Sequence, residues 1–149
     1  MSAGRLMATA ASAALLLLAG CAATPASAPS QNASPKLFDV AAHEAAIYVI
    51  RSERVGGAIP LEVLIDGQRI GATVARSYLY AVVAPGIRMV ESRGDIRSTL
   101  EVDAKPGTIT YLSQVVELTY LSSPRTRLRP VNESQGREWV RELKAAPPR

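Results

Sequence analysis

The sequence predicts an all-β fold, a sandwich or a barrel, with one short helix near the C-terminus. Two observations support this prediction. Apolar and polar residues alternate with a period of two in several short segments, and turn-forming residues separate these segments at regular intervals. Because 149 residues with 48% apolar content can supply one ordinary hydrophobic core and hardly two, we expect a single domain over residues 36–144.

The first expected strand and the hairpin after it show this pattern clearly. Residues 46–51 (AIYVIR) are rich in β-forming residues and apolar on both faces, which suits a central strand. Residues 61–65 (LEVLI) alternate, and Asp66-Gly67 then supplies a tight turn, because glycine adopts positive φ without strain. The segment QRIGATV is expected to return as the second strand of the hairpin.

Two later turns combine proline with glycine. Ala84-Pro85-Gly86 follows residues 77–83 (SYLYAVV), another strand that is apolar on both faces. Lys105-Pro106-Gly107 precedes the long segment TITYLSQVVEL. The segments IRMVESR and TLEVD, between these turns, are further expected strands.

A helix is expected after the strands. Asn132, with Gln135 three residues later, resembles a capping box and predicts a helix over residues 133–144. We expect Trp139 on this helix to pack against the sheets. Residues 145–149 are expected to form a disordered tail.

The N-terminus has the three parts of an export signal. Arg5 lies in a short positive start, residues 6–18 are apolar, and small residues lead through Gly20 to Cys21, the only cysteine. We therefore expect residues 1–20 to be a signal peptide. The apolar stretch is well short of the roughly 20 residues that a membrane-spanning helix needs.

Leu18-Ala19-Gly20-Cys21 resembles the lipobox of bacterial lipoproteins. The resemblance implies cleavage between Gly20 and Cys21 and a lipid on Cys21, whose thiol is the nucleophile that alkylation requires. Several acyl chains on one residue anchor a protein stably, since each buried methylene contributes about 0.8 kcal/mol. The alternative is a soluble secreted protein that is cleaved at a later site, for instance after Ala28.

Residues 21–35 are expected to hold the lipidated cysteine and a linker. AATPASAPSQNASP contains three prolines and no charge, and it could span about 40 Å in an extended conformation. Ala22, rather than an aspartate, follows Cys21, which resembles the pattern of lipoproteins that are transported to the outer membrane. We therefore expect the domain to be anchored to the outer membrane, on its periplasmic face.

The order of motifs resembles a domain of unknown function found in small bacterial lipoproteins. In that family an IYVYR strand leads to a VDGxxIG hairpin, a SYFxxxxPPG strand and turn, and a late xxGxxYYL strand. This chain has AIYVIR, LIDGQRIG, SYLYAVVAPG and KPGTITYLSQV in the same order, over residues 45–116. Ala84 replaces the first proline of the family turn, and Tyr111 stands alone where the family often has two tyrosines.

That resemblance implies an antiparallel β-sandwich of about seven strands, either immunoglobulin-like or transthyretin-like and akin to PEGA surface domains. It brings no catalytic residues.

Residues suited to catalysis are sparse. His43 is the only histidine, and Ile47 stands four residues later, so the zinc metalloprotease motif is absent. With Cys21 expected to carry lipid, neither a Ser/His/Asp nor a Cys/His nucleophile can be assembled in the usual way. We expect no enzyme, no metal and no cofactor. The alternative is a small hydrolase or transferase acting on envelope glycans or lipids, which would need two convergent carboxylates or an activated hydroxyl.

The most suggestive polar cluster is Arg125, Arg127 and Arg129 in the segment RTRLR. Pro124 and Pro130 flank this segment, which indicates a sheet edge, because proline cannot donate to a β-ladder. Alternation would display the three guanidiniums on one face, as candidate contacts for an anionic partner such as lipid headgroups, lipopolysaccharide or peptidoglycan. The alternative is that these charges only prevent edge-to-edge aggregation. Nucleic acid is a poor candidate, because no aromatic residues interleave with the arginines.

The aromatic side chains admit two interpretations. Most have apolar neighbours in expected strands, which favours packing in the core, and the alternative is a sugar-binding surface. The residues concerned are Tyr48, Tyr78, Tyr80, Tyr111 and Trp139.

The sequence as a whole predicts a lipid-anchored, non-enzymatic binding or structural module of the cell envelope, with an envelope protein or a glycan as its partner. The formal net charge of +4 is too small to indicate a partner by itself. A further alternative is a chaperone-like module that accepts a client strand at a sheet edge.

Overall fold

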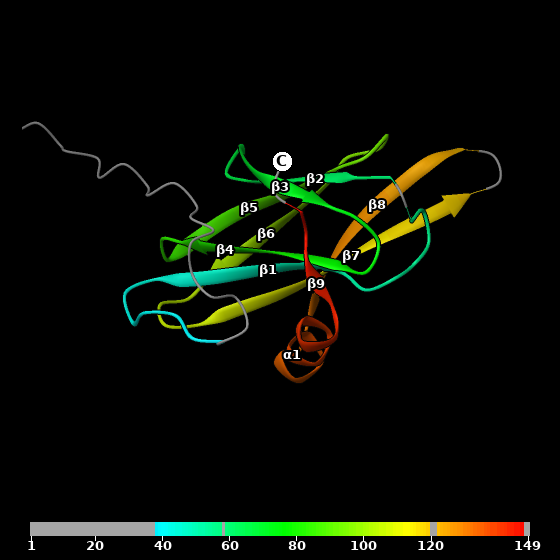
Figure 1. Cartoon of the computed structure of the whole chain (residues 1–149). Helices are drawn as coiled ribbons and strands as arrows, with labels where there is room; N and C mark the ends of the chain where they lie inside the picture. The colour runs from blue at the N-terminus through cyan, green and yellow to red at the C-terminus, as the bar shows by residue number, and fades with distance from the viewer. Residues whose placement is uncertain (1–37, 58, 120–121, 148–149) are drawn as a thin grey trace, which may run out of the picture.

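The computed structural model describes residues 38–57, 59–119 and 122–147, which form two β-sheets and one helix (Figure 1). The elements are β1 (Ala45–Arg51), β2 (Leu61–Ile65), β3 (Gln68–Thr73), β4 (Ser77–Val83), β5 (Gly86–Arg93), β6 (Ser98–Ala104), β7 (Ile109–Thr119), β8 (Ser122–Val131), α1 (Glu133–Glu142) and β9 (Lys144–Ala145). The described residues thus hold nine strands rather than about seven. The all-β class with one short helix is confirmed.

The two sheets share the strands unequally. One sheet has the order β8-β7-β1-β4-β9 and the other β3-β2-β5-β6. Most neighbouring strands are antiparallel, but β1 and β7 are parallel, as are β4 and β9. The chain passes from one sheet to the other after β1, β3, β4 and β6. The two turns that combine proline with glycine therefore connect the sheets and do not close hairpins.

Strand β1 lies in the middle of the molecule, and all seven of its residues are buried. Ala45, Ile47 and Val49 point into the core between the two sheets. Tyr48 and Ile50 point to the opposite face, which α1 covers. This three-layer arrangement is the reason why AIYVIR is apolar on both faces, and it confirms the prediction of a central strand.

The hairpin between β2 and β3 turns at Asp66-Gly67, as predicted. Asp66 has φ of 50° and Gly67 has φ of 79°, the combination that a type I′ turn requires. The Asp66 carboxylate accepts hydrogen bonds from the backbone N–H of Met89 and from the Arg88 guanidinium, at 2.9 Å each. These bonds fix the turn against β5.

Helix α1 begins as predicted and ends earlier. The Asn132 side chain accepts a hydrogen bond from the Gln135 backbone N–H at 2.9 Å, which confirms the N-cap. Leu143 is extended, and β9 then pairs with the first two residues of β4. This pairing ends the helix at Glu142 rather than at residue 144, and it includes Ala145, which the sequence assigned to the tail.

Candidate functional site

The residues predicted for lipid attachment and cleavage, Cys21 and Gly20, lie outside the described residues. Both therefore stay predictions. Among the described residues, no group of three or more His, Cys, Asp and Glu side chains could hold a metal ion. In the same part of the chain, no helix is long and apolar enough to cross a membrane.

The arginine cluster lies on β8, which forms an edge of the five-stranded sheet. Arg125, Arg127 and Arg129 are exposed and alternate with buried Thr126 and Leu128. The predicted edge position and common face of the three arginines are therefore confirmed. The strand is longer than RTRLR, since its bounds include both flanking prolines.

Two of the three guanidiniums already face a carboxylate. Arg127 approaches Glu117 of β7 at 2.8 Å, and Arg129 lies 3.5 Å from the same side chain. Any anion at these arginines would compete with Glu117. Such exposed pairs contribute about 0–1 kcal/mol each to stability, so their main effect is to offset the positive charge of the cluster. Whether the cluster binds an anionic partner stays a prediction.

The outer side of β8 is partly covered. Ile96 forms a parallel bridge with Arg125, and the Leu128 backbone N–H donates to the Ser98 hydroxyl at 3.2 Å. A client strand would therefore have to displace the segment that joins β5 to β6. The opposite edge of this sheet is formed by β9.

An apolar hollow of about 340 Å³ opens beside β8, between residues of the two sheets. Its apolar lining comes from Ile59, Pro60, Leu61 and Val116, and Thr126 contributes a hydroxyl. Charged side chains at the lining are Glu62, Arg93 and Asp95. We call this hollow, together with the exposed side chains of Val55 and Ile96 and the exposed part of Ile59, the groove end.

A buried cation supports the groove end. Arg51, fully buried at the end of β1, donates to the carbonyls of Ile59 at 2.7 Å, Gly56 at 2.9 Å and Val55 at 3.0 Å. Burial lowers the pKa of the Arg51 guanidinium from its usual value. Three carbonyl oxygens replace the water that this cation loses, and in return the guanidinium fixes the connection between β1 and β2.

A buried polar network lies next to the hollow. The Gln114 side chain accepts a hydrogen bond from Thr73 and donates to the Ser92 hydroxyl at 2.6 Å. Thr126, which lines the hollow, donates to the Ser92 carbonyl at 3.3 Å. These bonds join four strands from both sheets, and through Thr126 they reach the lining of the hollow.

The tyrosines serve packing. Tyr48, Tyr78, Tyr80 and Tyr111 are at most 7% exposed, and the rings of Tyr48 and Tyr111 stack with centroids 5.3 Å apart. Burial raises the pKa of all four phenols above the usual value, most strongly for Tyr48. The interpretation as core packing is confirmed for these four residues.

Two other hollows are more polar. One of about 210 Å³ lies against the first turn of α1, where Arg137 already pairs with Glu133 at 2.6 Å. The other, of about 460 Å³, lies along Arg76, Glu142 and Lys144. The apolar share of the lining is largest at the groove end, which distinguishes it from both.

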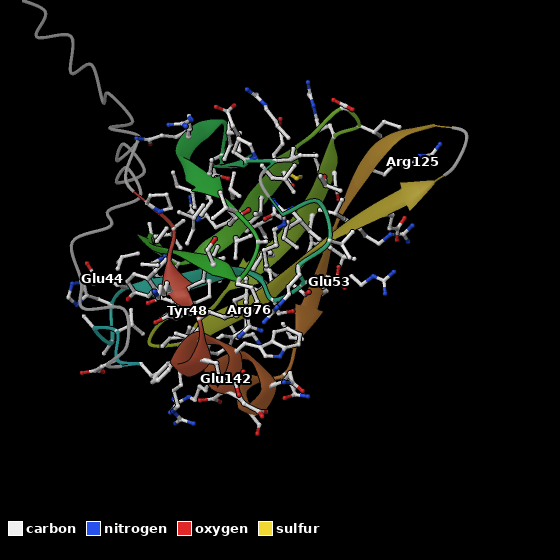
Figure 2. The ribbon with its side chains drawn as sticks, turned by 45° about the vertical axis from the view of Figure 1, so that its right-hand side comes forward. Glu44, Tyr48, Glu53, Arg76, Arg125 and Glu142 are labelled. Carbon is white, nitrogen blue, oxygen red and sulfur yellow. The ribbon has the colours of Figure 1, made fainter. Side chains whose placement is uncertain are left out.

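The groove end is far from the point at which the chain enters the domain. The chain reaches β1 at Ala45, and the connection that lines the groove begins after Arg51 at the other end of this strand, about 20 Å away. Figure 2 shows Glu44 at one end of the molecule and Glu53 and Arg125 toward the other. The groove end and the point of chain entry therefore occupy opposite ends.

Sequence reasoning missed this site because its lining comes from four separate segments. The signal that could have indicated it is the pair Val55 and Ile59, two large apolar residues in a connection otherwise made of polar residues, glycine, alanine and proline. Comparisons with protein-family models, curated proteins and solved structures found no match for this chain.

Proposed function

We propose that this protein is a lipid-anchored module of the bacterial envelope that acts by binding, on the periplasmic face of the outer membrane. The lipobox-like Leu18-Ala19-Gly20-Cys21 supports the anchor, and the linker over residues 22–35 supports a domain held clear of the lipid surface. The motif order supports membership of the lipoprotein domain family described above.

One geometric observation carries the binding role. The apolar hollow and the exposed Val55, Ile59 and Ile96 lie at the end of the domain opposite to the chain entry. A domain tethered at one end presents this surface away from its anchor, where a protein partner can reach it. Concave apolar surface with a few placed polar groups is the usual form of a binding site.

The transthyretin-like arrangement is the finer fold that we propose. In an immunoglobulin domain the first two strands share a sheet and the third lies in the other. Here β1 and β2 lie in different sheets, β2 pairs with β3, and β1 is parallel to β7. This order supports the second of the two sandwich types that the motif resemblance implies.

The test of the anchor is the Cys21→Ser variant, expressed in a bacterium with two membranes. We expect the wild type in the outer-membrane fraction, with an intact mass that starts at Cys21 and includes acyl chains. The variant should be soluble or retain its signal. A wild-type product that begins after Ala28, or that carries an unmodified cysteine, would refute the anchor.

The test of the binding role is crosslinking in intact cells, followed by mass spectrometry. A photoreactive residue at Ile59 should capture a defined partner, and the same residue at Ile87, on the outer face of the four-stranded sheet, serves as the matched control. Equal recovery from both positions would contradict binding at the groove end.

A further inference from the structure

We propose that residues 38–44 form a strap that the Phe38 side chain holds on α1, and that this strap detaches while both sheets stay folded. Figure 1 shows the segment in blue and cyan, immediately before β1. Detachment lengthens the tether of the domain, and this consequence alone rests on the proposed anchor. The contacts of the strap, its backbone hydrogen bonds and the hollow beneath it support the proposal.

The Phe38 ring attaches the strap to α1. The Cζ atoms of Arg137 and Arg141, both on this helix, lie 5.1 Å and 5.4 Å from the centre of the Phe38 ring. A guanidinium over the face of an aromatic ring is attracted to its π electrons. The centre of the Tyr48 ring lies 6.2 Å away, and Val40 packs against the same aromatic cluster. Two side chains therefore make the apolar contacts of the strap.

The backbone is fastened only at the other end of the strap. In the part of the chain that the structure describes, no backbone hydrogen bond and no ion pair joins residues 38–43 to a residue outside the strap. The first such bond is at Glu44, whose carbonyl accepts from the Gly107 backbone N–H at 2.7 Å. The Ala46 N–H then donates to the Thr108 carbonyl at 3.0 Å. This arrangement places the hinge at Glu44.

The strap is not closely packed along its length. A hollow of about 210 Å³ lies between residues 38–40 on one side and residues 107–109 with the first turn of α1 on the other. Phe38 also has φ of 51°, a conformation that bulky residues rarely adopt because of steric crowding. Segments with few buried contacts open at a lower free energy than the core. We therefore expect the strap to open before the sheets do.

The sheets do not depend on the strap for their pairing. Strand β1 is hydrogen-bonded to β4 on one side and to β7 on the other. A pull on the N-terminal side of the chain acts on Phe38 before it acts on any strand, so the strap yields first. Its seven residues then add about 20 Å of extended chain to the tether.

The test is cleavage of the full lipidated protein, in detergent, by a protease that cuts on the N-terminal side of aspartate. Asp39 lies in the strap, and exposed Asp95, between β5 and β6, is the internal reference. A protease needs several extended residues around the bond, which the attached strap does not offer. We expect wild-type cleavage before Asp39 to be slower than in a matching synthetic peptide and to proceed without denaturant. Intact mass identifies each product.

Two substitutions should speed this cleavage and leave cleavage before Asp95 unchanged. Arg141→Gln removes one of the two cation–π contacts and should raise the rate about threefold. Phe38→Ala removes both contacts and should raise the rate at least tenfold, after division by the rate of a peptide with the same change. Glu142→Gln, an exposed change next to Arg141, is the matched control and should have no effect.

Three results would overturn the proposal. One is wild-type cleavage before Asp39 at the rate of the peptide, since the strap would then not be held. Another is cleavage only at urea concentrations that unfold the sheets. The third is a Phe38→Ala variant in which cleavage before Asp39 is unchanged, or rises no more than cleavage before Asp95, because general loss of stability would explain the latter.

These outcomes are separate from those of the proposed function. Cys21→Ser should lose membrane fractionation and keep the cleavage pattern of the wild type, whereas Phe38→Ala should keep fractionation and change the pattern. If the wild type proves to be unanchored and Phe38→Ala still speeds cleavage before Asp39, the strap stands and only the lengthening of a membrane tether is refuted.

Discussion

Gly136→Ala on α1 is a sharp test of how the helix packs on the sheet. A Cβ atom at this position would lie 2.4 Å from Cγ and Cδ1 of Tyr111 and 2.7 Å from its Cβ. Carbon atoms in contact normally stay about 3.5–4.0 Å apart, so the helix or the ring must move by about 1 Å. The Tyr111 ring cannot retreat freely, because it stacks on the buried ring of Tyr48.

Two opposing effects decide the sign. Alanine stabilises an exposed helix interior by about 1 kcal/mol relative to glycine, whereas overpacking a core costs about 1–3 kcal/mol. Because the ring is held between two layers, we take about 3 kcal/mol for the overpacking cost. After the helix gain of about 1 kcal/mol, the free energy of unfolding should fall by about 2 kcal/mol. For a domain of this size the loss lowers Tm by about 8 °C.

Urea unfolding followed by far-UV circular dichroism measures this loss. Ser134→Ala, an exposed change in the same helix, is the control and should be neutral or slightly stabilising. Introducing Tyr111→Leu should remove most of the penalty of Gly136→Ala, which a double-mutant cycle will show. The packing argument is wrong if Gly136→Ala is as stable as the control.

Three further predictions follow from named contacts. Arg51→Met should lower the free energy of unfolding by at least about 3 kcal/mol, because charge-assisted hydrogen bonds to three carbonyls are lost. Hydrogen exchange should show an opened connection between β1 and β2. Unchanged protection there would contradict this role of Arg51. Asn132→Ala should cost about 1 kcal/mol through loss of the N-cap, measured by urea unfolding, and an unchanged midpoint would count against it. The pKa values of the buried tyrosines are raised in the folded state, so stability should be complete below the unfolded pKa of about 10 and fall as the pH rises above it. Phenolate absorbance should then appear together with unfolding, and ionisation of these four phenols in a protein that stays folded would refute their burial.

Local patterns were sufficient to predict several elements of this fold. Asp66-Gly67 predicts its turn because two consecutive positive φ angles are accessible to few residue pairs. Asn132 predicts the helix start because its side chain satisfies a backbone donor within the same turn. The alternation of RTRLR likewise places its three arginines on one face. Each of these predictions depends on residues no more than a few positions apart.

Contacts between segments that are distant in the sequence could not be predicted from such local patterns. Nothing in Lys144–Ala145 indicates a strand, since two residues carry no period, and β9 forms because α1 delivers them to the free edge of β4. In the same way, nothing in the sequence around Glu117 indicates that its carboxylate pairs with Arg127. That pair exists because β7 and β8 align in one particular register.

The sequence by itself determined the β class, the turns, the helix start and the expectation of an anchored N-terminus, because each is encoded in a short contiguous stretch. Only the tertiary structure decided which strands share a sheet, to which three carbonyls Arg51 donates, and that Ile59, Val116 and Thr126 line one hollow. The physical reason is that sheet pairing and packing depend on free energies summed over both sheets, and no window along the chain contains that sum.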